Sequence, residues 1–120
     1  MLIAHADTTT HTTPNAVMTT LAAPSLGADD LAVWRVTMEP GQAGPIHAVG
    51  NEQVWVILEG SAQVTLGETE LTAGPGDTVI CPAGTPRQVK APEGLVALVA
   101  TRAGTSVSTD EGTRPLPWAA

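Results

Sequence analysis

A histidine just before a buried strand is the first residue of this chain whose type and position could support chemistry. His47 follows the glycine-rich turn at 41–44, and a polar segment at 51–53 separates it from the apolar run at 54–58. Polar groups at the end of a buried strand tend to face a cavity or to find buried partners, because a buried polar group without a hydrogen bond is costly. This stretch is therefore the first candidate for a functional site.

The apolar run at 54–58 has the composition of a strand buried on both faces, since it combines β-branched residues with a tryptophan. Short apolar or alternating segments of this kind recur along the chain and are separated by Gly/Pro turns. A helix over 29–35 is the one alternative, but Glu39-Pro40-Gly41 ends that segment as a turn would. The pattern predicts an all-β sandwich or barrel. Its strands are expected at 15–22, 31–38, 54–58, 61–66, 70–73, 78–81, 87–91, 95–101 and 105–109.

The length of 120 residues suits one domain with a single core. We expect an N-terminal arm and first strand over residues 1–22, followed by one barrel domain over residues 23–120. The threonine-rich segment 5–14 buries little, so it is either disordered or an arm that pairs with a second subunit. His5, Asp7 and His11 could suggest a metal site there, but a solvated tail is the simpler interpretation.

Charge and cysteine content restrict the partners and the compartment. The formal net charge of −7 argues against nucleic acid or an anionic membrane as a partner, because both favour Lys and Arg. The single cysteine, Cys81, allows no internal disulfide and no multi-cysteine zinc site, and we interpret it as a small buried hydrophobe. No apolar run reaches transmembrane length, and residues 1–4 are too short for a signal-peptide core. A cytoplasmic location is the resulting expectation.

Two groups of glycines and prolines carry a family resemblance. The spacing resembles the two motifs of the cupins, which are small β-barrels of jelly-roll type. The first motif is Gly, five residues, His-x-His, three or four residues, Glu, six residues, Gly. The second is Gly, five residues, Pro-x-Gly, two residues, His, three residues, Asn. The resemblance covers residues from about 31 to 101, and its framework matches are Gly41, His47, Gly60, Gly76, Pro82 and Gly84.

The resemblance keeps the framework but not the metal ligands. The positions that hold three His and one Glu in metal-binding cupins hold His47, Val49, Gln53 and Arg87 here. Valine has no donor atom, arginine stays protonated, and glutamine ligates weakly. Glu52 lies one residue from the expected position, and a one-residue slip turns a strand side chain to the other face. The prediction is a site without metal or other cofactor.

The cupin framework implies that His47, Gln53 and Arg87 converge on one interior. There Arg87 could stabilise an anion and keep His47 neutral, so that His47 acts as the general base. Gln53 would orient the substrate or set the His47 tautomer. The predicted function is a metal-free isomerase, cyclase or dehydratase acting on a small hydrophobic carbonyl compound, as in aromatic polyketide cyclases of bacterial secondary metabolism. The residues expected to contact the substrate are Gln53, Trp55, Val49, Trp34 and Val89.

Other interpretations stay open. His47 could be a hydrogen-bonded structural histidine, Arg87 could pair with an acidic residue (Glu39, Glu52 or Asp77), and the tryptophans could be core fillers. The protein could be a non-catalytic binding or sensor cupin, or a metal-dependent oxygenase or isomerase with atypical ligands that include His5 or His11. It could also be a structural barrel within a dimer. We expect a homodimer with a small-molecule ligand, because exposed β-edges favour pairing. Trp118 is expected to plug one end of the barrel or to pack on a partner.

Overall fold

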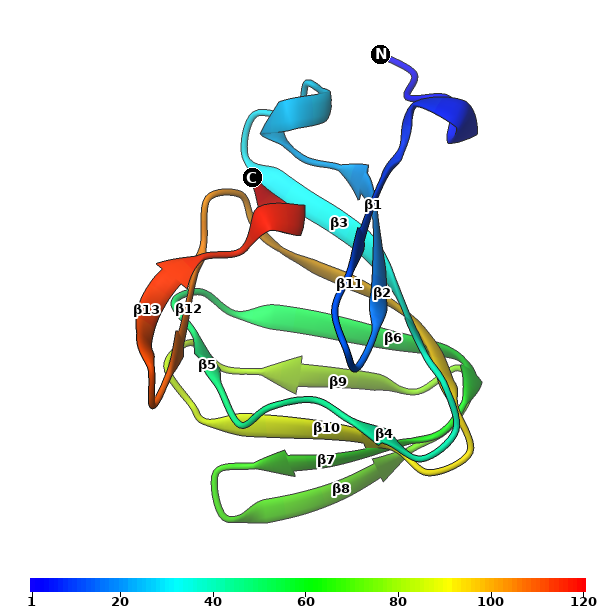
Figure 1. Ribbon diagram of the computed structural model, residues 1–120, viewed down its shortest axis with the longest axis vertical. Helices are drawn as coiled ribbons and strands as arrows, with labels where there is room; N and C mark the ends of the chain where they lie inside the picture. Colours follow the sequence, from blue (N-terminus) through cyan, green and yellow to red (C-terminus); the bar gives the residue numbers. More distant parts are fainter.

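The computed structural model describes residues 1–120, and strands in antiparallel sheets make up most of its regular structure (Figure 1). The all-β prediction is confirmed, and the antiparallel sheets are consistent with the jelly roll that the resemblance implies. The strands form three sheets in the orders β1-β2-β3-β11-β6-β9, β4-β10-β7-β8 and β13-β12-β5. No helix is long and apolar enough to span a membrane. The strands are β1 (Thr9–Thr12), β2 (Val17–Ala22), β3 (Leu31–Met38), β4 (Gln42–Ala43), β5 (Ala48–Val49), β6 (Gln53–Gly60), β7 (Ala62–Leu66), β8 (Thr69–Ala73), β9 (Thr78–Cys81), β10 (Arg87–Ala91), β11 (Leu95–Arg102), β12 (Ser106–Thr109) and β13 (Gly112–Pro115), and the 3₁₀ turns are η1 (His5–Asp7), η2 (Pro24–Leu26) and η3 (Pro117–Ala119).

The predicted strands at 31–38, 78–81 and 87–91 occur with the predicted bounds, and residues 29–35 do not form a helix. The structure differs at both ends of the chain, where β1 and β13 were not predicted. β1 pairs antiparallel with β2 of its own chain, so the N-terminal segment is an ordered hairpin. The hydroxyl of Thr13 accepts backbone N–H bonds from Asn15 and Ala16, which stabilises the hairpin turn.

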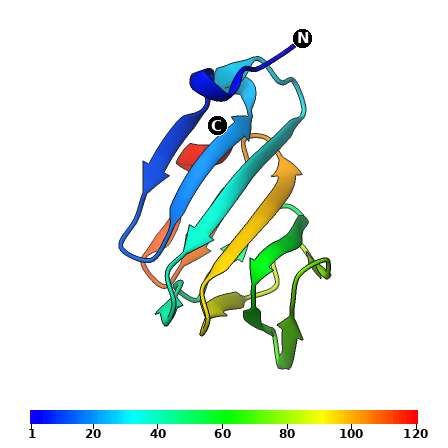
Figure 2. The same ribbon diagram turned by 90° about the vertical axis from the view of Figure 1, so that its right-hand side faces the viewer.

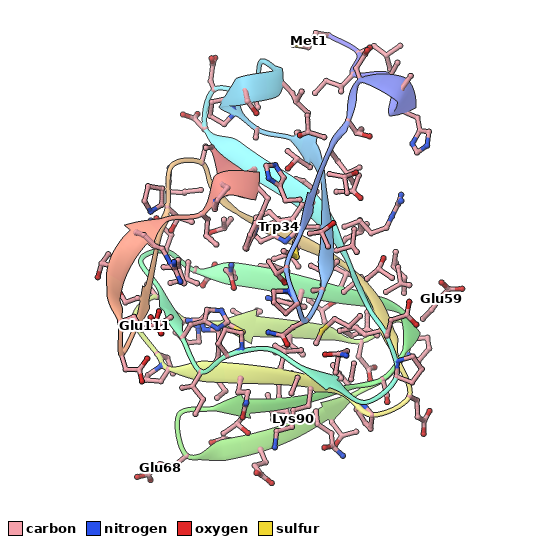
Figure 3. All side chains as sticks on the ribbon, in the orientation of Figure 1. Met1, Trp34, Glu59, Glu68, Lys90 and Glu111 are labelled. Atoms are coloured by element: carbon pink, nitrogen blue, oxygen red, sulfur yellow. The ribbon has the colours of Figure 1, made fainter.

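The core lies between the inner face of the six-stranded sheet and the two smaller sheets. Along β3 the side chains of Ala32, Trp34, Val36 and Met38 are buried, while their neighbours are half-buried or exposed, as expected for a strand with a period of two. Figure 3 shows Trp34 inside the molecule, whereas the labelled glutamates lie at its periphery. The sheets thereby enclose one contiguous apolar cluster.

The glycine that ends the first motif has a steric role. Gly60 has a φ of 76°, a left-handed conformation that side chains rarely adopt, and an added Cβ would lie 2.0 Å from the carbonyl oxygen of Gly94. No residue with a side chain fits at this position. The match in motif spacing at Gly60 therefore reflects a close approach between the end of β6 and the turn before β11.

Candidate functional site

A cavity of about 470 Å³ opens on the inner face of the six-stranded sheet. This volume is within the range of small-molecule sites. Its mouth is formed by the β1–β2 turn at 13–16 and by the C-terminal segment at 114–118, which are far apart in the sequence. In Figure 1 the C-terminal turn η3 lies beside the strands of the N-terminal hairpin, which it contacts. The wall is mainly apolar and includes Met18, Trp34, Val36, Met38, Trp55 and Val89.

His47 lines this cavity and is held from two sides. Its backbone pairs with that of Arg87 through N–H···O bonds of 2.9 and 2.8 Å, which fixes the loop before β5 against β10. Its ring Nδ1 lies 2.9 Å from the carbonyl oxygen of Pro45. A carbonyl oxygen can only accept, so Nδ1 carries the proton in the neutral ring and Nε2 carries the lone pair. His47 therefore has one nitrogen, Nε2, left to act as an acceptor or a base.

The protonation state of His47 follows from its surroundings. Burial lowers the pKa of the imidazole below its usual value, and the positive charge of Arg87 lowers it further. The hydrogen bond to Pro45 opposes this shift. The net effect favours the neutral ring at neutral pH, so Nε2 is free to accept a proton.

Gln53 is 2 % exposed and lines the same cavity. Its Oε1 accepts hydrogen bonds of 3.3 Å from Nη1 of Arg87 and from Nε1 of Trp55. Both partners can only donate, so the orientation of the amide is determined. Nε2 of Gln53 donates to no protein atom. The only fully enclosed side-chain polar atom without a hydrogen bond is Thr105 Oγ1, so Nε2 of Gln53 is accessible from the cavity. Gln53 therefore presents an N–H donor to the cavity.

Arg87 lies behind Gln53 and does not line the cavity. The side chain is 1 % exposed, and Nη2 donates to the carbonyl oxygens of Pro82 and Thr85 at 2.7 and 2.8 Å. Nε also donates to Thr85 at 3.1 Å. A buried guanidinium requires such partners, because an unpaired buried charge is costly. His47 and Gln53 thus line one cavity, as predicted, whereas Arg87 does not. Arg87 instead bonds to the side chain of Gln53 and to the backbone of His47. Its other partners are backbone carbonyls, in place of the acidic residues considered from sequence.

Cys81 lies close to the guanidinium of Arg87 but is not activated by it. The side chain is 1 % exposed, and burial raises the pKa of the thiol above its usual value despite the opposing charge of Arg87. The thiol is therefore protonated at neutral pH. Cys81 behaves as a small core residue.

The other sequence-predicted contacts divide into two groups. Trp34, Trp55 and Val89 line the cavity, but Val49 is packed in the core and does not. Sequence reasoning missed Met18 on β2 and the part of the C-terminal segment that precedes Trp118. No periodicity or motif in these terminal segments points to the cavity, because only the fold brings them there.

Trp118, which we expected to plug one end of the barrel or to pack on a partner, lies in the C-terminal segment. It lies at the mouth, its backbone carbonyl accepts from Thr20 Oγ1 at 2.8 Å, and its ring centroid lies 6.3 Å from that of His11. It therefore joins the C-terminal end of the chain to the N-terminal hairpin.

The residues at the metal position of metal-binding cupins do not fit a transition metal. Nowhere do three His, Cys, Asp or Glu side chains lie close enough together to hold an ion. Of the four corresponding positions, Val49 has no donor atom, Arg87 is cationic, and the Gln53 oxygen already accepts two hydrogen bonds. His47 alone provides a free ligand atom. A site without metal stays a prediction.

Comparisons with known proteins find the same fold in cupin proteins. A family described as the cupin domain matches residues 34–101. The polyketide cyclase RemF from Streptomyces resistomycificus superposes with a TM-score of 0.73 at 20% identity, covering 85% of this chain and 78% of that one. KdgF from a Halomonas species superposes with a TM-score of 0.73 at 18% identity, covering 85% and 94%. These two similarities show the fold alone.

Auxin-binding protein 5 of Zea mays is 35% identical over 54 residues, which are 45% of this chain and 36% of the maize protein. The matched segment thus spans about a third of that relative. The match of the cupin domain over more than half of the residues, together with the jelly-roll architecture, shows that this chain belongs to the cupin family.

Proposed function

We propose that this cupin is a proton-transfer enzyme, an isomerase or cyclase, that acts on a small apolar carbonyl compound with His47 as the general base. One observation carries the proposal: an unprotonated Nε2 of His47 and an unpaired N–H donor of Gln53 belong to the same, mainly apolar cavity. A base and a hydrogen-bond donor on one apolar wall are the two groups that enolisation needs.

The first chemical step moves one proton. Nε2 of His47 takes a proton from a C–H next to a substrate carbonyl, and the electron pair of that bond moves onto the carbonyl oxygen. The Gln53 N–H then donates to the enolate oxygen, where negative charge develops. Because the Arg87 guanidinium donates to Oε1 of the same amide, it polarises the Gln53 N–H toward the enolate. Arg87 is thus a positioning residue in this proposal.

The enolate has two outcomes that balance without a co-reactant. In an isomerase, the His47 imidazolium returns the proton to a different atom of the substrate. In a cyclase, the enolate carbon attacks a second carbonyl of the same molecule, and the imidazolium protonates the new alkoxide. The low pKa of His47 favours both, since a weakly basic imidazole releases its proton readily. The indole rings of Trp34 and Trp55 provide flat walls for a ring-shaped substrate.

A deuterium-exchange assay tests the proposed base. The probe is 2-tetralone in D₂O, and exchange of its acidic C–H is followed by proton NMR. The native protein should accelerate exchange above the buffer rate, whereas His47→Gln should not. His5→Gln is the matched control, because His5 is exposed and does not line the cavity. Equal exchange by the native protein and His47→Gln would show that His47 is not the base.

A second candidate is a binding protein without catalysis. The observation in its favour is that the cavity is mostly apolar, with few polar groups, which is also how capture sites are built. The maize relative that matches part of this chain is named as an auxin-binding protein, so binding of a small molecule is part of the name of one relative. This candidate predicts a ligand-dependent rise in Tm, about 2.7 kcal/mol of stabilisation at one hundred times Kd, with no exchange or product at any pH.

A further inference from the structure

The charge of the cavity lining differs from that of the whole chain. The protein has 12 acidic residues and a net charge of −7, yet no Asp or Glu lines the cavity. The lining contains one permanent cation, Arg114. The remaining polar lining groups are neutral, His47 among them at neutral pH. The cavity is therefore positive relative to its surroundings.

The position of Arg114 follows from strand pairing. It lies on β13 directly opposite Val107 of β12, and side chains of directly opposed residues share one face of an antiparallel pair. Val107 also lines the cavity, so this face of the C-terminal hairpin is turned toward it. Arg114 is exposed, which places its guanidinium at the mouth rather than in the interior. The cation and the buried polar pair of His47 and Gln53 are thus at different depths of one cavity.

We infer that the ligand of this cavity is a planar apolar acid whose carboxylate is bound by Arg114 while its carbonyl end lies at His47 and Gln53. The inference rests on the proposed function for the reacting end but concerns a different contact. Guanidinium pairs with carboxylate in a bidentate geometry, which favours an acid over a neutral amide of the same shape. Because Arg114 is solvent-exposed, the preference should be about fivefold and should weaken as salt is added.

A pair of isosteric probes tests this inference. 2-Naphthoic acid and 2-naphthamide are titrated into the protein, and binding is followed by intrinsic fluorescence, since all three tryptophans line the cavity. The native protein should bind the acid about fivefold more tightly than the amide. Arg114→Gln should remove that preference and leave amide binding unchanged. Arg102→Gln is the matched control, because Arg102 is an exposed cation outside the cavity and its loss changes net charge equally.

Each outcome decides one of the two proposals. An unchanged preference in Arg114→Gln, equal binding of both probes by the native protein, or no saturable binding of either overturns the assignment of Arg114. Loss of exchange activity is not one of these outcomes. If the acid preference depends on Arg114 while tetralone exchange stays at the buffer rate, the site is an acid-binding pocket and the proposed catalysis fails alone.

Discussion

Replacing Arg87 by methionine should destabilise the protein strongly, although the residue does not touch the cavity. The substitution keeps an apolar stem but removes every donor. It leaves the carbonyl oxygens of Pro82 and Thr85 and the amide oxygen of Gln53 without their guanidinium partner. An acceptor left unpaired in the interior costs about 1–3 kcal/mol. Of these three acceptors, Gln53 retains its bond from Trp55 and Pro82 retains a 3.4 Å bond from the backbone N–H of Thr85, so the expected loss is about 3–5 kcal/mol rather than the full sum.

Chemical denaturation measures this loss. A decrease of about 3–5 kcal/mol is a large part of the 5–15 kcal/mol that holds most domains folded, so the urea midpoint should fall clearly and Tm should fall by about 10 °C or more. Arg102→Met is the matched control, because its guanidinium is exposed and its loss should change stability by about 0.5 kcal/mol or less. A loss below about 1 kcal/mol for Arg87→Met would refute the structural role assigned to this arginine.

Three further predictions follow from the described geometry. The pKa of His47 in the folded protein lies below its usual value of about 6.5, which is the value expected for the unfolded chain. Between these two pKa values the unfolded chain binds more protons, so the free energy of unfolding should fall as pH drops. This pH dependence should disappear in His47→Gln, and an unchanged dependence contradicts the shift. Gly60→Ala should prevent stable folding, because its Cβ would overlap the Gly94 carbonyl. Gly84→Ala, with open space around the added Cβ, should lower the free energy of unfolding by about 1 kcal/mol in urea denaturation. Equal losses of stability in the two variants contradict the steric argument. Cys81 should react with a thiol reagent only as fast as the chain opens, and rapid labelling of the native protein contradicts its burial.

Much of the fold could be predicted from the sequence because the determinants are local. The alternation of apolar and polar residues over 31–38 specifies a strand and its buried face without reference to the rest of the chain. Left-handed glycines such as Gly76 and Gly84 mark turns that few other residues form easily. The spacing of these turns and strands was enough to predict an all-β sandwich or barrel, and the resemblance to the cupin motifs implied the jelly roll. The lack of ligand atoms at Val49 and Arg87 was visible from residue type alone.

The roles within the cavity were decided by tertiary structure. The sequence predicted a positive charge from Arg87 beside His47 in the cavity. In the structure the carbonyls of Pro82 and Thr85 hold the Arg87 guanidinium behind Gln53. The cation that lines the cavity is Arg114 from the C-terminal hairpin. Residue type states which hydrogen bonds a side chain can make, whereas their partners depend on backbone brought together from distant parts of the chain. An arginine has five donors and several reachable acceptors, and the closest carbonyls in the folded chain determine which way it points.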